Sequence, residues 1–290
     1  MTELDSSDVV RVRLDFSYDG GGFQGWASQP DFRTVQAVME EALTRVIRRV
    51  GHIRLTVAGR TDAGVHARNQ VAHFDVPREA WERCASRSVT DPEQALLYRL
   101  WSVLERDIVV KRVSVAQPGF DARFSAIARR YSYRISDRAE TRDPLRRDHV
   151  LWNRRALDID ALNAAALTVT GLRDFAPYCR PREFATTIRE LHRFSWERPA
   201  SGPDAGLVVA TLEADAFCHS MVRSLVGAVK DVGSGRRDLA WLASHSDFSE
   251  RSPGVSVVPP HGLILEFVQY PDEAEMAARA ESTRRRRSLD

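Results

Sequence analysis

The sequence predicts an α+β protein made of two halves, each combining strands with helices on one face. Three observations support this fold class: an alternating strand close to the N-terminus, a strand–helix–strand order after it, and a looser recurrence of that order beyond the tripeptide QPG at residues 117–119. A chain of 290 residues can form one large domain or two ordinary ones, and it can bury a substantial core without metal or disulfide crosslinks. We therefore expect two halves of similar size.

The first half begins with VVRVRLDFSY at residues 9–18, where apolar and polar side chains alternate as in a half-buried strand. Thr34 is placed to cap the helix that follows, whose apolar residues keep near-helical spacing up to Gly51. Alternation then resumes, which predicts two strands, at residues 53–57 and around residues 71–76. The half closes with one more predicted helix and strand, at residues 92–104 and 108–115.

The second half repeats this order less regularly. The predicted strands are YSYRI, IRELHRFSW, LVVATLEA and LILEFVQY, and the predicted helices are ALDIDALNAAALTVTG and HSMVRSLVGAVKDVG. The domain prediction is therefore an N-terminal half at residues 8–117, a C-terminal half at 118–271 and a tail at 272–290. The tail is charged and sparsely apolar, which is typical of a frayed helix or a disordered segment.

The composition predicts a soluble protein of the cytoplasm. The first ten residues are acidic and polar rather than apolar, and no apolar run approaches the ~20 residues of a membrane span. The three cysteines, Cys84, Cys179 and Cys218, are odd in number, far apart and without a C-x-x-C pair. We expect them to be ordinary thiols in a reducing compartment.

Positive charge is concentrated in one segment of the chain. The net charge is only +2, but residues 119–155 hold ten arginines against five acidic residues. Such a segment is either a solvated arginine-rich face or a surface for nucleic acid, because arginine interleaved with aromatics, as in RRYSYR, suits phosphate contact and base stacking. The residues alone leave both interpretations open.

Few chemical motifs are present. The glycines at 20–22 follow a strand but lack the spacing of a phosphate-binding loop, so we interpret them as a turn. There is no G-x-S-x-G and no H-E-x-x-H, and the histidines are scattered singly. The sequence therefore predicts no metal site and no cofactor.

One polar turn stands out, GRTDAGVHA at residues 59–67, which holds a single carboxylate, Asp62. Asp beside Gly commonly just stabilises a turn. Alternatively, a loop between strands can aim side chains into a cleft, and Arg60 two residues away would keep Asp62 ionised, as a nucleophile or general base must be.

The stretch GRTDAGVHA resembles the catalytic signature of the tRNA pseudouridine(38-40) synthases, the TruA family. The resemblance extends along nearly the whole chain, through YDGGGFQGWASQPDFRTVQ, FDARFSAIARRYSYRI, ADAFCHSMVRSLVGAV and HGLILEFVQYP. It implies a pseudouridine synthase fold, in which two ferredoxin-like halves form a joined antiparallel sheet with flanking helices and a central cleft. It also implies a homodimer that binds tRNA.

The resemblance further implies an isomerase that detaches uracil from ribose, turns the base and rejoins it through carbon in the anticodon stem-loop, with no cofactor. Asp62 would be the catalytic carboxylate, acting either on the nucleoside covalently or as a base toward the sugar. Arg60 would help to flip the target nucleotide. Tyr131 would stack on the uracil; the alternative from the sequence alone is a core-facing strand tyrosine, because Tyr133 and Ile135 share its alternation. Arg223 would pair with the aspartate, and Leu263 would contact the base.

The sequence also departs from the family pattern at Trp101, Glu105 and His261, which concerns loop shape and RNA contacts more than the Asp62 signature. Two other functions agree with part of this sequence. A non-catalytic RNA-binding module would keep the arginines and stacking residues but would gain nothing from a carboxylate that repels phosphate. An aspartate-dependent glycoside hydrolase would normally need a second carboxylate and has no use for the basic segment.

Overall fold

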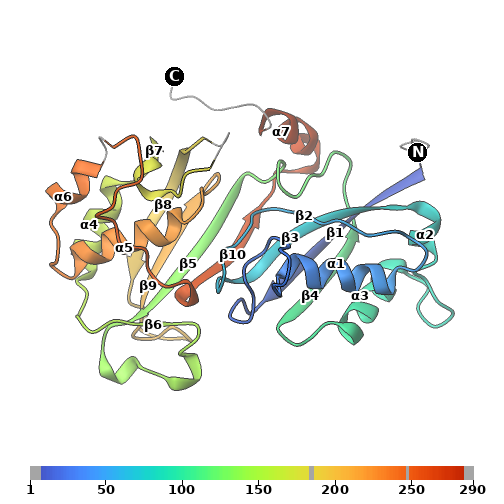
Figure 1. The fold of residues 1–290 in the computed structure, drawn as a ribbon, viewed down its shortest axis with the longest axis horizontal. Coiled ribbons are helices and arrows are strands. Elements are labelled where there is room, and N and C mark those ends of the chain that lie inside the picture. The colour runs from blue at the N-terminus through green and yellow to red at the C-terminus, as the bar shows by residue number, and fades with distance from the viewer. Residues whose placement is uncertain (1–7, 183–185, 246–247, 284–290) are drawn as a thin grey trace. The chain divides into compact units, whose positions relative to one another are not determined.

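The computed structural model describes residues 8–182, 186–245 and 248–283 (Figure 1). These residues form two compact units. The first comprises the described residues up to Ala126 and those from Val268 onward, and the second comprises the described residues of Ile127–Phe267.

The first unit is a four-stranded antiparallel sheet with the strand order β4-β1-β3-β2. Figure 1 shows α1 and α3 over one face of this sheet. The chain order strand–helix–strand–strand–helix–strand with this strand order is the ferredoxin-like arrangement. The elements are β1 (Val9–Tyr18), α1 (Val35–Val46), β2 (Thr56–Val57), β3 (His66–Pro77), α2 (Arg78–Glu82), α3 (Pro92–Val103) and β4 (Ile108–Val115).

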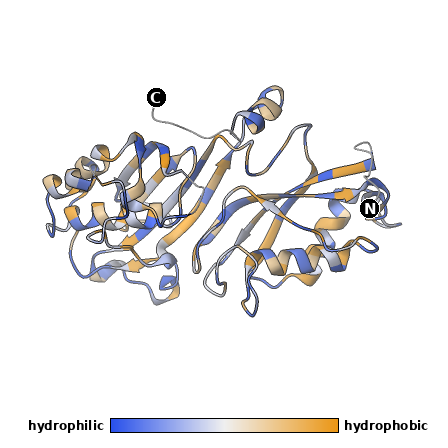
Figure 2. Ribbon diagram, turned by 45° about the horizontal axis from the view of Figure 1, so that its top comes forward, coloured by the Kyte–Doolittle hydropathy of each residue, from blue (hydrophilic) through white to orange (hydrophobic). Residues whose placement is uncertain are grey.

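The alternation of β1 builds the core of this unit. Every second residue is buried, and the side chains of Val12, Leu14 and Phe16 have no exposed surface. The helix α1 begins where the sequence predicts it, because the Thr34 hydroxyl accepts a hydrogen bond from the Ala37 N–H. The buried residues of α1 are mostly apolar and recur at helical spacing. Figure 2 shows hydrophobic and hydrophilic residues mixed along the helices, as expected for elements with one face on a sheet.

The second unit repeats this arrangement. Its strand order is β10-β5-β9-β8-β7, with the short β6 parallel to β5, and its helices are α4, α5 and α6. Without β6, β7 and α6, the order along the chain is again strand–helix–strand–strand–helix–strand. The elements are β5 (Ala128–Ser136), β6 (Leu151–Trp152), α4 (Ile159–Thr168), β7 (Gly171–Asp174), β8 (Ile188–Glu197), β9 (Val208–Ala214), α5 (Met221–Gly233), α6 (Leu239–Ser244) and β10 (Leu263–Gln269).

The predicted α+β class is confirmed, and the differences concern boundaries and short elements. The helix α1 ends at Val46, before the predicted stop at Gly51, and Arg49 in the intervening turn has a positive φ of 62°. The strand predicted at 53–57 pairs only at Thr56–Val57. No helix among the described residues is long and apolar enough to cross a membrane.

The expectation that all three cysteines are thiols is wrong for two of them. Cys179 and Cys218 form a disulfide, with 5.8 Å between their Cα atoms, and Cys84 is a buried thiol. The two cysteines are 39 positions apart in sequence, but the intervening β8 and β9 pair with each other and return the chain to its starting point. This proximity follows from strand pairing, which cysteine spacing does not reveal.

The chain after residue 271 is partly described. Residues Glu273–Glu275 form a 3₁₀ turn, and Met276–Thr283 form α7, whose Met276 and Ala280 are buried. The Ser125 hydroxyl donates a hydrogen bond to the Met276 carbonyl, which joins α7 to the first unit. The arginine run at 284–287 lies outside the described residues.

Candidate active site

Asp62 lies in the loop between β2 and β3 and is half-buried, and Arg60 on the same loop is exposed. The N–H of Val65 donates to the backbone carbonyl of Asp62 at 3.2 Å and closes a tight turn. The third residue of this turn, Gly64, has φ +75°, which favours glycine. The bond that closes this turn is made by the main chain of Asp62.

The glycine-rich stretch at residues 20–25 packs directly on this loop. The Trp26 N–H donates to the Thr61 carbonyl at 3.0 Å, and the Gly64 N–H donates to the Phe23 carbonyl at 3.3 Å. A Cβ atom on Gly20 would lie 2.0 Å from the Val65 carbonyl oxygen, so this position admits only glycine. These glycines bring two backbone segments into contact, which is consistent with their interpretation as a turn.

A buried network of polar side chains from β1 and β3 holds the loop in place. The Tyr18 hydroxyl lies 2.7 Å from Oγ1 of Thr61, the residue before Asp62. The Gln70 amide donates to the Tyr18 hydroxyl at 3.2 Å and to the Gly59 carbonyl at 3.0 Å. Tyr18 and Gln70 are 4% and 0% exposed, so water does not compete for these bonds.

The network is neutral at physiological pH. Burial raises the pKa of Tyr18 to about 12, so its hydroxyl keeps its proton. The sequence did not reveal the roles of Tyr18 and Gln70. Tyr18 fits the apolar alternation of β1 and so reads as a core residue. Gln70 gave no clearer signal, because it is one of several polar residues in the sequence of β3.

The other three candidate residues lie on neighbouring elements of the second unit. Tyr131 on β5 is 7% exposed, and its ring meets Phe217 edge-on at 5.2 Å. Arg223 on α5 donates from Nε to the Val258 carbonyl at 2.8 Å, and the Val258 N–H donates back to the Arg223 carbonyl at 3.3 Å. Leu263 begins β10, the strand next to β5, and is 4% exposed.

The segment between Val258 and Leu263 connects these residues. It is bound to α5 through Arg223 and to β5 through the Tyr133 hydroxyl, which donates to the Pro259 carbonyl at 2.8 Å. Burial lowers the pKa of His261 within this segment. The structure thus places Arg60 and Asp62 together in the first unit, and Tyr131, Arg223 and Leu263 on adjoining elements of the second.

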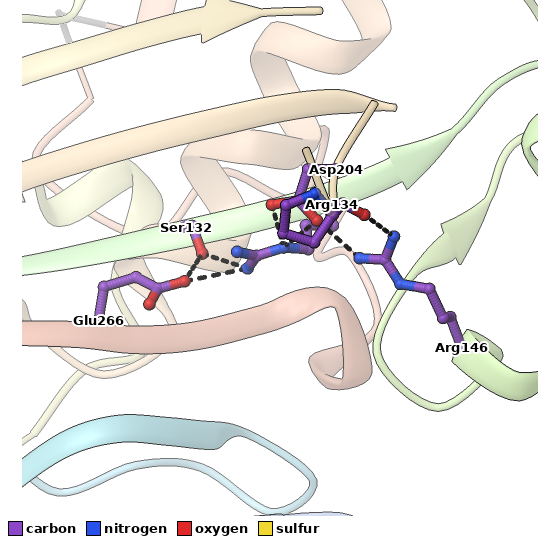
Figure 3. Close-up of polar contacts among 6 residues, drawn as sticks. Ser132, Arg134, Arg146, Asp204 and Glu266 are labelled. Atoms are coloured by element: carbon purple, nitrogen blue, oxygen red, sulfur yellow. Dashed lines mark hydrogen bonds and ion pairs between the residues drawn. The ribbon is translucent and has the colours of Figure 1, made fainter. Parts of the chain in front are cut away.

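An ion-pair network in the second unit joins β5 to β10 and to the connection between β8 and β9 (Figure 3). Asp204 pairs with Arg134 at 2.9 Å and with Arg146 at 2.6 Å, and Arg134 also pairs with Glu266 at 3.0 Å. Burial would raise the pKa of Asp204, but the hydrogen bond from Arg146 and the charge of Arg134 outweigh it and lower that pKa. The Asp204 carboxylate is therefore held charged between two arginines.

The comparisons with known proteins point to one family. A family model described as "tRNA pseudouridine synthase" matches residues 165–271. The tRNA pseudouridine synthase A of Streptomyces griseus is 51% identical over 289 residues, which are 100% of this chain and 98% of that protein. The protein of the same name from Frankia casuarinae is 51% identical over 276 residues, 95% of each chain, and that from Bifidobacterium longum is 44% identical over 303, covering 97% of this chain and 100% of the relative.

Proposed function

This chain belongs to the tRNA pseudouridine synthase family, and we propose on that premise that it isomerises uridine to pseudouridine in the anticodon stem-loop of tRNA, at positions 38, 39 and 40. In the reaction the bond from ribose C1′ to uracil N1 breaks, the base turns, and C1′ bonds to C5. The hydrogen of C5 is released and N1 gains one, so substrate and product are isomers. The chemistry therefore needs no redox partner and no energy donor.

Asp62 is the proposed catalytic carboxylate. The observation that carries this assignment is the rigid support of its loop, which has a close glycine contact at Val65 and a buried polar network bonded to Gly59 and Thr61. A side chain fixed in this way can act on C1′ as a nucleophile or accept a proton from the sugar as a base. Both actions need the charged oxygen that an amide lacks.

The remaining residues are proposed to handle the nucleotide. The exposed Arg60 would help to extrude the target uridine from its stack. Tyr131, with its ring oriented by Phe217, would stack on the uracil, Leu263 would contact the base, and Arg223 would pair with Asp62. The basic segment at 119–155 would bind tRNA phosphates, in a cytoplasmic homodimer.

The decisive experiment changes Asp62→Asn. This variant should fold and should bind tRNA about as tightly as the parent, since phosphate contacts elsewhere supply most of the affinity. Its release of tritium from uracil C5 should fall below detection. A matched control is Asp160→Asn, which changes an exposed acid on α4 and should leave both readouts unchanged.

The results also separate the rival functions. A non-catalytic RNA-binding module would bind tRNA but release no tritium even in the parent protein. Tritium release by Asp62→Asn at the parental rate would exclude Asp62 as the catalytic group. Joint loss of folding and activity would make Asp62 a turn residue.

A further inference from the structure

The chain between β5 and α4 forms a projection that we name the basic arm, residues 137–155. It leaves β5 after Ser136, passes through two 3₁₀ turns and returns as β6, which pairs with the end of β5. Its acidic residues are partly used inside the fold: Asp137 is buried against Arg198, and Asp143 caps the second turn. Its exposed arginines are Arg138, Arg142, Arg147, Arg154 and Arg155.

The arm is anchored rather than loose. Arg146 joins it to the β8–β9 connection through Asp204, the acid that Arg134 also holds (Figure 3). At the other end, the Asn153 N–H donates to the Ser136 carbonyl at 2.7 Å. A surface fixed before binding loses little conformational entropy when a partner arrives.

Trp152 is the exposed aromatic side chain of this anchored arm. It lies on the two-residue strand β6 and is 43% exposed, although tryptophan is a costly residue to leave in water. The guanidinium of Arg142 lies 5.9 Å from its ring centroid, and a hydrogen bond from Arg142 to the Asn153 carbonyl at 3.3 Å holds it there. An indole face beside a fixed cation matches one base and its phosphate.

We propose that Trp152 and Arg142 form a stacking platform for one nucleotide of the tRNA, distinct from the uridine that is modified. This proposal rests on the proposed function, because it takes tRNA as the partner. Charge complementarity selects a nucleic acid over a protein segment: five arginines of the arm are exposed against two exposed acids, Glu140 and Asp148, and among the described residues only Arg147 is paired with one of these acids, Asp148 at 3.3 Å. The platform contributes binding and takes no part in the isomerisation.

The test compares Trp152→Leu with the parent and with Tyr98→Leu, which removes an aromatic ring of similar exposure, 46%, on α3 of the first unit. Loss of one stacked base should weaken tRNA binding by roughly 5- to 150-fold. The turnover rate at saturating tRNA should stay at the parental value while KM rises. Trp152→Phe, which keeps an aromatic face, should recover most of the affinity.

Salt dependence separates the two members of the platform. Stacking is uncharged, so Trp152→Leu should lower the affinity by the same factor at every salt concentration. Arg142→Gln should instead reduce the slope of log affinity against log salt by about 0.7 to 0.9, the value of one phosphate contact. Thermal unfolding of each variant shows whether the fold is kept.

A tRNA affinity of Trp152→Leu equal to that of the parent would overturn the platform, as would a loss in Trp152→Leu that the Phe variant does not recover. Failure of the proposed function is seen separately, in the parent protein. A parent that forms pseudouridine while Trp152→Leu binds normally refutes the platform alone. A parent that binds tRNA without forming pseudouridine refutes the proposed activity alone.

Discussion

Changing Tyr18→Phe tests whether the buried network positions Asp62. The change removes the hydroxyl that lies 2.7 Å from Thr61 Oγ1 and accepts from the Gln70 amide at 3.2 Å. Each such bond contributes about 0.5–1.5 kcal/mol net, so the free energy of unfolding should fall by about 1–3 kcal/mol. The value should lie in the upper part of this range, because both residues at the centre of the network are almost completely buried and water cannot replace the lost partner.

The catalytic effect should exceed what this stability loss explains. Thr61 precedes Asp62 directly, so a loosened Thr61 side chain lets the carboxylate drift. A misplacement of about 1 Å can cost 10²-fold in rate. Single-turnover tritium release at saturating tRNA, measured well below the unfolding temperature, should therefore fall by about 10- to 100-fold with tRNA affinity unchanged.

The matched control is Tyr270→Phe. The Tyr270 hydroxyl donates to the Ala122 carbonyl at 2.7 Å, so this change also removes a tyrosine hydrogen bond in the first unit, away from the Asp62 loop. It should cost stability but little turnover. If Tyr18→Phe slows turnover no more than Tyr270→Phe does, the network supports the fold and does not position the carboxylate.

Three further predictions follow from the second unit. Tyr131→Phe should bind tRNA normally and turn over more slowly if the hydroxyl moves a proton, and Tyr131→Leu should lose activity as well as affinity; full activity in both, by tritium release, would make Tyr131 a plain strand residue. Burial favours a raised pKa for Asp137, but its hydrogen bonds from Arg198 and the Leu157 N–H outweigh it and lower that pKa. Its contribution to stability is therefore present above the unfolded value of about 3.9 and is lost as pH falls through the lower folded value, so in urea titrations at acid pH Asp137→Asn should flatten this loss. Cys179→Ser should lower the unfolding free energy by about 2–4 kcal/mol without reductant and should have a much smaller effect with it; equal unfolding curves of the parent with and without reductant would count against a disulfide in solution.

The sequence predicted the elements whose periodicity is long and regular. The strand at 9–18 and the helices beginning after Thr34 and Asp91 match, because alternation and capping are local properties. Short elements such as β6 and α6 were missed, since two to six residues carry too little pattern. The disulfide between Cys179 and Cys218 was missed for a different reason: it depends on the pairing of β8 with β9.

The candidate site was predictable in part. The motif at 59–67 located Asp62, because a tight polar turn is visible in sequence. Its supports were not predictable, since Tyr18 and Gln70 lie on two strands whose register brings them together only after β1 pairs with β3. Sequence periodicity places a residue on a face of a strand but does not identify its cross-strand hydrogen-bond partner.

The close approach of Gly20 to Val65 limits how this loop could be grafted onto another protein. The loop and the glycine-rich stretch are about 40 positions apart in sequence, yet they pack directly against each other and share main-chain hydrogen bonds. A transplanted GRTDAGVHA would have to bring residues 18–26 with it, together with the strand that carries Gln70. The same contact predicts that the two segments evolve together, because a substitution in one of them is tolerated only if the other still fits against it.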